Sequence, residues 1–334
     1  MASKNYYRQN LAFIQKLAKK KNWQLDPGLV RKAIGKPNPR FCYFPLTNVL
    51  GKRLFFKSCL HGKLDLRPRI IKEFKIQDWL KSLGGPVRRI IESGREGPIF
   101  WYTGSDLLGQ DVIHCQEENI TGLTFDHITN LARQICWLWE IKKNNLPADL
   151  KKSLFLRLKK SELVKNVDRE LQRHLAILDS AISVPEIGWG KEDKKKVIAF
   201  YENHRKEAFK TDQADGVLVH GDLAPNNIFF GTKKIVIIDW ETAYWGNNLL
   251  IELGMDVASF YTRCWEKEKL GIKLVRELQK SLPTKVSIYR QALRFAMIMK
   301  SLQKLCPMFE EGFYRSEYDR RHIYFLVNLI RENV

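Results

Sequence analysis

The sequence has no long apolar segment and few cysteines. Among its 334 residues no uninterrupted apolar run exceeds five, as in Ile323 to Val327, whereas a membrane-spanning helix needs about 20. We therefore expect no transmembrane segment, and the N-terminus lacks the apolar region of a secretory signal. The six cysteines are dispersed, without a C-x-x-C pair or a zinc-type cluster. This pattern predicts reduced thiols in a cytoplasmic protein.

Acidic residues are scarce in the first part of the chain. Residues 1–75 contain 18 Lys and Arg but only three acidic residues, Asp26, Asp65 and Glu73, which gives a net charge of +15. The whole chain carries +20, so the other 259 residues contribute only +5. An excess of positive charge of this size is informative about the binding partners of a protein and not about its fold. We expect residues 1–75 to contact an anionic surface or polymer, or else to be merely solvated.

The basic part begins with a predicted amphipathic helix over residues 6–21. Its apolar stripe is accompanied by lysines at positions 16, 19, 20 and 21. A helix of this kind resembles those that rest on an anionic lipid surface. The alternative is a solvated helix that caps its own domain.

Short strands and one further helix are expected in the rest of the first third. Residues 41–46 and 52–58 have the composition of two hairpin strands joined by a turn. Residues 67–82 follow the helical period and end at a Gly-Gly-Pro segment. Residues 87–91 and 98–103 are further strand candidates.

Helices dominate the second part of the chain. We expect them over residues 124–143, 161–183 and 195–211, and again from Trp245 to the end. Apolar residues in 161–183 recur at steps of three and four, which indicates one buried helical face. Short apolar strands separated by turns interrupt the helices between 217 and 239. The sequence therefore predicts an α+β protein.

The residues most informative about chemistry lie between 217 and 241. Asp222 occupies a loop after an apolar strand, Asn227 follows five residues later, and Asp239 ends the next strand. Because a hairpin brings strand ends together, we expect these side chains to converge. A carboxylate can accept the proton of a hydroxyl, and carboxylate and amide oxygens suit Mg²⁺. Phosphoryl transfer needs such a proton acceptor and such metal ligands. The alternative is that both aspartates are ordinary turn residues at strand ends.

The segments HGDLAPNNI and IIDWE resemble the aminoglycoside phosphotransferase and choline kinase family, which has a protein-kinase-like fold. The matching residues are His220, Gly221, Asp222, Asn227, Asp239, Trp240 and Glu241. The resemblance implies two lobes, a small β-rich N-lobe over 1–103 and a larger helical C-lobe over 104–334. It implies that Asp222 is the base or orients the hydroxyl, and that Asn227 and Asp239 bind Mg²⁺. ATP or GTP would donate the phosphate.

The resemblance extends with less force to the N-lobe. Lys57 closes a strand where the family places the lysine that binds the α- and β-phosphates, and Glu73 lies on the next helix, where its partner stands. The segment PIFWYTG resembles the strand and hinge that hold the adenine, and the hinge would consist of Trp101, Tyr102, Thr103 and Gly104. The chain has no G-x-G-x-x-G loop, and residues 35–40 are the expected cover of the phosphates.

Four more residues receive roles from their neighbourhood. We interpret His220 as a structural residue that holds the loop by hydrogen bonds, and not as the base. Asp256 resembles the family's structural aspartate. Tyr244 and Trp245, soon after Asp239, are candidates for an aromatic wall against the substrate, although such aromatic residues also form helix-packing cores.

The function implied is the Mg²⁺-dependent phosphorylation of a hydroxyl on a small molecule such as an aminoglycoside, choline or an amino sugar. Two alternatives stay open. The strong positive charge makes an anionic glycan or a lipid-linked sugar at a membrane surface a plausible acceptor. A catalytically weak, kinase-like binding protein would use the basic N-lobe as an interaction surface. A nucleic-acid partner has only charge in its favour.

Overall fold

The computed structural model describes residues 4–35, 40–107, 112–115, 120–154, 160–208, 217–231, 234–246, 249–281 and 286–334. The chain forms a two-lobed, kinase-like α+β fold. Its first compact unit consists of Met1–Val112 and Val236–Thr242, and its second of Ile113–Ile235 and Ala243–Val334. The small first unit carries the larger sheet, and the second unit is mainly helical.

The first unit is built on a five-stranded sheet in the order β1-β2-β3-β5-β4. Its strands are β1 (Gln24–Leu25), β2 (Cys42–Thr47), β3 (Arg53–Ser58), β4 (Ile90–Glu96) and β5 (Ile99–Ser105). Three helices accompany it: α1 (Lys4–Lys21), α2 (Pro27–Ile34) and α3 (Arg67–Ser82). β5 lies between β3 and β4 and pairs antiparallel with both.

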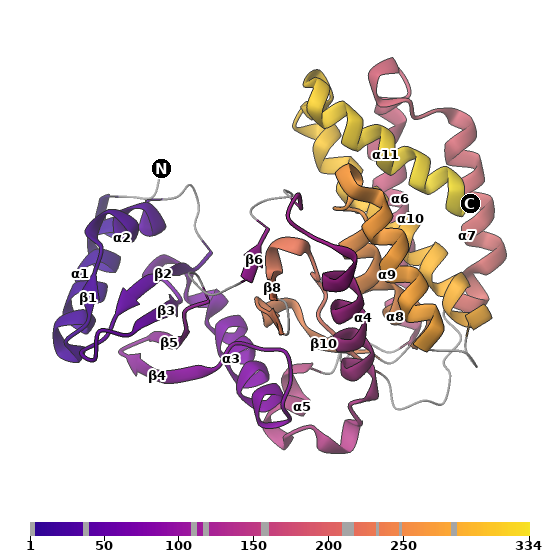
Figure 1. Cartoon of the computed structure of the whole chain (residues 1–334). Helices are drawn as coiled ribbons and strands as arrows, with labels where there is room; N and C mark the ends of the chain where they lie inside the picture. The colour runs from indigo at the N-terminus through magenta and orange to yellow at the C-terminus, as the bar shows by residue number, and fades with distance from the viewer. Residues whose placement is uncertain are drawn as a thin grey trace. The chain divides into compact units, whose positions relative to one another are not determined.

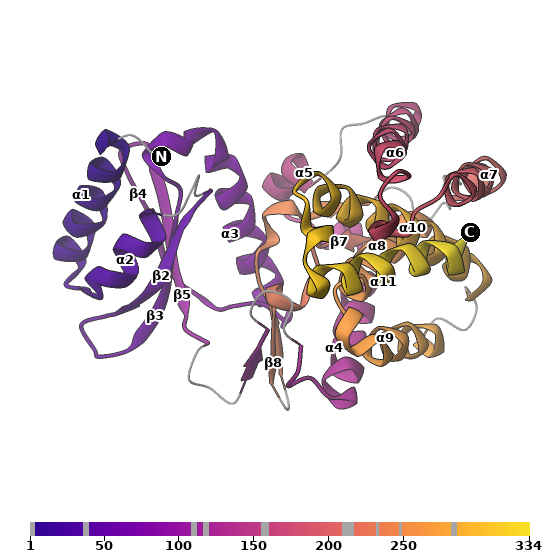
Figure 2. The same cartoon turned by 90° about the horizontal axis from the view of Figure 1, so that it is seen from above.

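The sheet of this unit is covered by helices on both of its faces (Figure 2). Helices α1 and α2 lie on one side of the sheet and α3 on the other (Figure 2). Successive side chains of a strand point to opposite faces. Phe56 and Trp101 stack on each other in the core that α1 and α2 cover. Their neighbour Lys57 therefore faces α3.

Helix α1 is bound to its own unit through both its faces. Its apolar residues Phe13, Ile14 and Leu17 are buried in the core of the unit. On its polar side, Lys16 and Lys20 form ion pairs with Glu96, and Lys21 pairs with Glu92 on the same strand. The apolar stripe is thus covered by the sheet, and three of the four lysines have acidic partners. These contacts favour the interpretation of a helix that caps its own domain.

The second unit is a helical body. Its longer helices are α4 (Phe125–Glu140), α5 (Ala148–Leu154), α6 (Lys160–Ala181), α7 (Lys191–Ala208), α8 (Leu249–Tyr261), α9 (Glu268–Ser281), α10 (Val286–Glu310) and α11 (Glu317–Asn333) (Figure 1). Helices α6, α7, α10 and α11 share one core, to which Leu175, Leu178, Leu302 and Leu326 contribute. The predicted helical stripe of residues 161–183 is confirmed, because Leu171, Leu175 and Leu178 lie in that core.

Short strands in this unit frame the loops that carry the sequence motif. β7 (Leu218–Val219) pairs antiparallel with β10 (Tyr244–Trp245). β8 (Ile228–Gly231) lies between β6 (Val112–His114) and the start of β9 (Ile235–Ile237). Along the described stretches of the chain, no helix is both long enough and apolar enough to cross a membrane.

The division of the chain differs from the predicted one in two respects. The expected boundary between Thr103 and Gly104 falls inside β5, which continues to Ser105 because both neighbouring strands pair with it there. The chain also returns to the first unit at Val236–Thr242, since Ile237 forms a parallel bridge with Val87 and its amide donates to the carbonyl of Pro86.

Candidate active site

Lys57 is the central cation of the first unit. Its ammonium donates to Glu73 Oε2 at 2.7 Å and to Asp239 Oδ1 at 2.9 Å. The lysine is 6% exposed, and burial alone would lower its pKa. The two carboxylates outweigh that effect and raise the pKa of Lys57 well above its ordinary value. The side chain is therefore held in place as a permanent cation.

Glu73 is fixed by further hydrogen bonds from its surroundings. Tyr102 donates its hydroxyl to Glu73 Oε1 at 2.9 Å, and Gln77 donates its amide to the same oxygen at 3.3 Å. Gln77 lies one helical turn after Glu73 on α3, so both face the sheet. A buried charge is tolerable only when it is paired and its other lone pairs are satisfied, and Glu73 meets both conditions.

Asp239 takes an unusual backbone conformation. Its φ is +64°, in the left-handed region that residues other than glycine rarely occupy. Aspartate tolerates this region better than most residues, and such strain gathers at functional sites. Its side chain is 38% exposed while one oxygen contacts Lys57. The next two residues are anchored, because Trp240 is fully buried and Glu241 pairs with Arg40 at 2.6 Å.

The residues predicted to form the adenine hinge lie within strand β5. Trp101, Tyr102 and Thr103 are all buried within β5, and their backbones pair with strands on both sides. The chain does not bend there, and the side chain of Tyr102 supports Glu73 instead. The apolar pattern of this segment marks an interior strand, which is why it resembled the strand leading to a hinge. Most of the expected phosphate cover at 35–40 lies outside the described residues.

In the second unit, His220 and Asp256 hold the loop that follows β7. Asp256 Oδ2 accepts a hydrogen bond from the His220 amide at 2.7 Å, and Oδ1 accepts one from the Gly221 amide at 2.9 Å. His220 is fully buried, and its Nδ1 accepts from the Asp222 amide at 3.3 Å. These contacts are those of structural residues. Gly221 has a φ of +85°, which glycine adopts without steric cost.

Asn227 and Asp222 are brought together by the same loop. The side-chain nitrogen of Asn227, Nδ2, donates to the Asp222 backbone carbonyl at 2.8 Å and to Asp222 Oδ2 at 3.3 Å. The side-chain nitrogen of Asn227 therefore faces Asp222, and its side-chain oxygen is directed away from Asp222. Asp222 is 41% exposed and can be reached from solvent. Asp239 belongs to the other unit, so the expected three-way convergence stays a prediction.

Two cations beside Asp222 have no counterpart in the predicted site. Arg263, just beyond α8, donates from Nη2 to Asp222 Oδ1 at 3.1 Å. Lys300, on α10, donates to the Gly221 carbonyl at 3.4 Å. Sequence reasoning missed them because they are 41 and 79 positions away from their partners. Nothing local distinguishes them from other basic residues of the helices.

The proposed aromatic wall is wrong for Trp245. This residue is fully buried and pairs with Leu218 across the β7–β10 ladder. Tyr244 is half-buried, and burial together with Glu252 and Asp256 raises the pKa of its hydroxyl. Trp240 and Phe260 are likewise fully buried. The aromatic residues after Asp239 therefore serve mainly as core.

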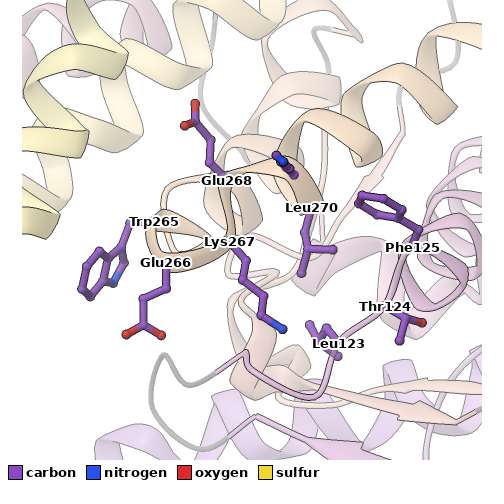
Figure 3. A pocket seen from close by; sticks show the side chains of 9 residues that line it. Leu123, Thr124, Phe125, Trp265, Glu266, Lys267, Glu268 and Leu270 are labelled. Carbon is purple, nitrogen blue, oxygen red and sulfur yellow. The ribbon is translucent and has the colours of Figure 1, made fainter.

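The second unit also has an open pocket of about 700 Å³, which Figure 3 shows. Leu123, Thr124 and Phe125 line it on one side, and residues 265–270 line it on the other. Lys267 points toward the opposite segment, where it donates to the carbonyl of Thr121. Charges of both signs surround the pocket, and none of the predicted site residues lines it.

Comparisons with known proteins identify the family and the fold of the chain. The model of the phosphotransferase enzyme family (APH) matches residues 43–275, which include both Lys57 and the loop at Asp222. The chain belongs to the phosphotransferase enzyme family. The resemblance found in the sequence is thereby confirmed. A search of curated protein sequences finds no significant match to this phosphotransferase.

Solved structures share the fold of this phosphotransferase at low sequence identity. The gentamicin complex of APH(2")-IIa is 15% identical with a TM-score of 0.52, and the match covers 96% of this chain and 95% of that one. A putative fructosamine-3-kinase from Thermobifida fusca is 14% identical with a TM-score of 0.52, covering 89% and 91%. Similarity at this level establishes the fold, and it leaves the acceptor to be argued from the site.

Proposed function

We propose that this phosphotransferase moves the γ-phosphate of ATP, or of GTP, to a hydroxyl group of a small molecule in an Mg²⁺-dependent reaction. The observation that carries the proposal is the anchored loop after β7. Asp256 fixes its backbone, and the half-exposed Asp222 stands beside Asn227. A loop fixed in this way holds the Asp222 carboxylate in a position where the hydroxyl of an acceptor can form a hydrogen bond with it.

Asp222 is the group that orients the acceptor hydroxyl and receives its proton. A positioned carboxylate of this kind acts on a bound hydroxyl at hydrogen-bond distance. His220 does not compete for this role, because it is fully buried and its Nδ1 accepts a bond from the Asp222 amide. The histidine therefore sets the position of Asp222 and takes no proton from the acceptor.

The residues present fit a bound Mg²⁺. The amide oxygen of Asn227 and the carboxylate of Asp239 are hard oxygen donors, and Mg²⁺ completes its shell with water and phosphate. Within the described residues no group of three or more His, Cys, Asp or Glu is arranged to hold a metal. Such a protein-only cage is not needed when the nucleotide supplies ligands. When bound, the ion would neutralise phosphate charge.

Lys57 is the phosphate-binding cation, and Glu73 positions it. The ammonium is permanently charged, since two carboxylates raise its pKa. The bonds from Tyr102 and Gln77 to Glu73 keep the pair in one geometry.

We further propose a cytoplasmic location, because no disulfide joins the cysteines and reduced thiols are typical of that compartment.

The test is an ATP-consumption screen of the purified protein. The acceptors would be aminoglycosides, choline, amino sugars and acidic sugars, each with and without Mg²⁺. Consumption that requires both a hydroxyl acceptor and Mg²⁺ supports the proposal. Tight nucleotide binding without consumption for any acceptor would instead favour the kinase-like binding protein.

A further inference from the structure

Two cations are built into the surroundings of Asp222. Arg263 reaches the carboxylate itself, and Lys300 reaches the carbonyl of the preceding residue, Gly221. Arg263 lies just beyond α8 and Lys300 lies on α10, and these two helices pack against each other in the second unit. Their positions are therefore set by the core of that unit and not by a surface loop.

Both side chains are held before any acceptor binds. Arg263 Nη1 donates to the carbonyl of Ser259 at 3.0 Å and to its hydroxyl at 2.9 Å, which leaves Nη2 directed at Asp222. Lys300 is half-buried, and burial lowers its pKa although Asp256 and Asp222 act in the opposite direction. A preorganised cation loses little entropy when it meets an anion.

Two of the acidic residues nearby are buried, so they are not available to bind a cation on an incoming molecule. Both oxygens of Asp256 already accept backbone hydrogen bonds, and Glu252 on α8 is 3% exposed. An acceptor hydroxyl that binds Asp222 thus arrives beside the Arg263 guanidinium, which is 23% exposed. A carboxylate or phosphate on the acceptor would form a charge-assisted pair with this guanidinium, whereas an ammonium group would gain nothing from it.

We propose that the acceptor of this enzyme carries an anionic group, a carboxylate or a phosphate, close to the hydroxyl that is phosphorylated. Arg263 is the ligand of that group, and Lys300 adds to the positive potential. The inference rests on the proposed function, since it concerns the molecule that Asp222 meets. It favours an acidic sugar or hydroxy acid over a polyamine such as an aminoglycoside.

The experiment compares sugars that differ in one substituent. Glucosamine, glucose, glucuronate and glucose 6-phosphate are tested for phosphate transfer from ATP and, separately, for binding by calorimetry. We expect the kcat/KM of at least one anionic sugar to exceed that of glucose by about tenfold or more, and glucosamine to be the poorest. The two anionic sugars distinguish a carboxylate from a phosphate preference.

Arg263→Gln should reduce the ratio of anionic to neutral kcat/KM by about tenfold or more, because one charge-assisted contact is removed. The matched control is Arg321→Gln, which removes the same charge from an exposed pair with Glu317 on α11. This control should leave the ratio unchanged.

Preference for glucosamine, or an unchanged ratio in Arg263→Gln, would overturn the inference while leaving the kinase function intact. Binding of an anionic sugar that depends on Arg263, without any transfer, would support the inference and contradict the proposed function. The absence of both binding and transfer for the two anionic sugars would also overturn the inference.

Discussion

Lys57 and Asp239 are 182 positions apart in the sequence, and the Lys57 ammonium donates to Asp239 Oδ1 at 2.9 Å. The same ammonium donates to Glu73 at 2.7 Å. The proposed phosphate-binding cation and a proposed metal ligand thus belong to one charged cluster within the first unit. A change at either residue alters the electrostatic environment of the other.

The first prediction concerns Lys57. Lys57→Ala should raise the ATP concentration needed for half-maximal rate by roughly tenfold or more, because charge-assisted hydrogen bonds contribute about 1.5–3 kcal/mol each. Steady-state kinetics over a range of ATP concentrations provide the measurement. Lys52→Ala is the matched control, since Lys52 is exposed in the turn before β3. An unchanged ATP requirement would mean that another basic residue binds the phosphates.

The second prediction concerns the metal. Asp239→Ala and Asn227→Ala should each weaken the dependence of nucleotide binding on Mg²⁺, because each removes a hard oxygen donor. Calorimetry of ATP binding at several Mg²⁺ concentrations measures the effect. Asp65→Ala removes an exposed carboxylate of the first unit and serves as the control. Wild-type Mg²⁺ dependence in both variants would refute their assignment as ligands.

The third prediction concerns stability and pH in the second unit. Asp193 accepts hydrogen bonds from Arg331 Nε at 2.7 Å and Nη2 at 2.9 Å, which join α7 to α11. Burial alone would raise the pKa of Asp193, but Arg331 outweighs it, so the pKa lies below its ordinary value. The resulting stabilisation is present above the unfolded pKa of about 3.9 and is lost as the pH falls through the lower folded pKa.

Asp193→Asn should therefore lower the free energy of unfolding by about 1.5–3 kcal/mol at pH 7. The difference from wild type should shrink once the pH falls below about 4. Denaturant titrations at both pH values test this. Asp179→Asn, in an exposed pair with Lys194, should cost no more than about 1 kcal/mol. A difference that persists unchanged at low pH would contradict the ion-pair explanation.

Much of the fold was predictable because its signals are local. The helical stripe at 161–183, the strands around Lys57 and the motif at 220–227 all depend on residues close together in sequence. The hydrogen bonds of the loop after β7 agree with the expected structural roles of His220 and Asp256. These features need no knowledge of tertiary packing.

The features that sequence reasoning missed arise from long-range packing. The role of Tyr102 depends on Glu73, which reaches it from α3 on one face of the sheet. Arg263 meets Asp222 only because α8 and α10 are packed in the second unit. The charge of residues 1–75 was visible, but the partners of Lys16, Lys20 and Lys21 on β4 were not. The composition of a segment gives its net charge but does not reveal which acidic residues pair with its lysines in the fold.

The most direct test of the account is the rate of phosphoryl transfer by Asp222→Asn. With an acceptor found in the screen, this variant should lose about 10²- to 10⁴-fold in rate, as expected when a positioned base is removed. ATP binding by calorimetry should stay near wild type, and Asp126→Asn, an exposed carboxylate at the start of α4, should keep full activity. A wild-type rate in Asp222→Asn would contradict the central claim that Asp222 acts on the acceptor hydroxyl.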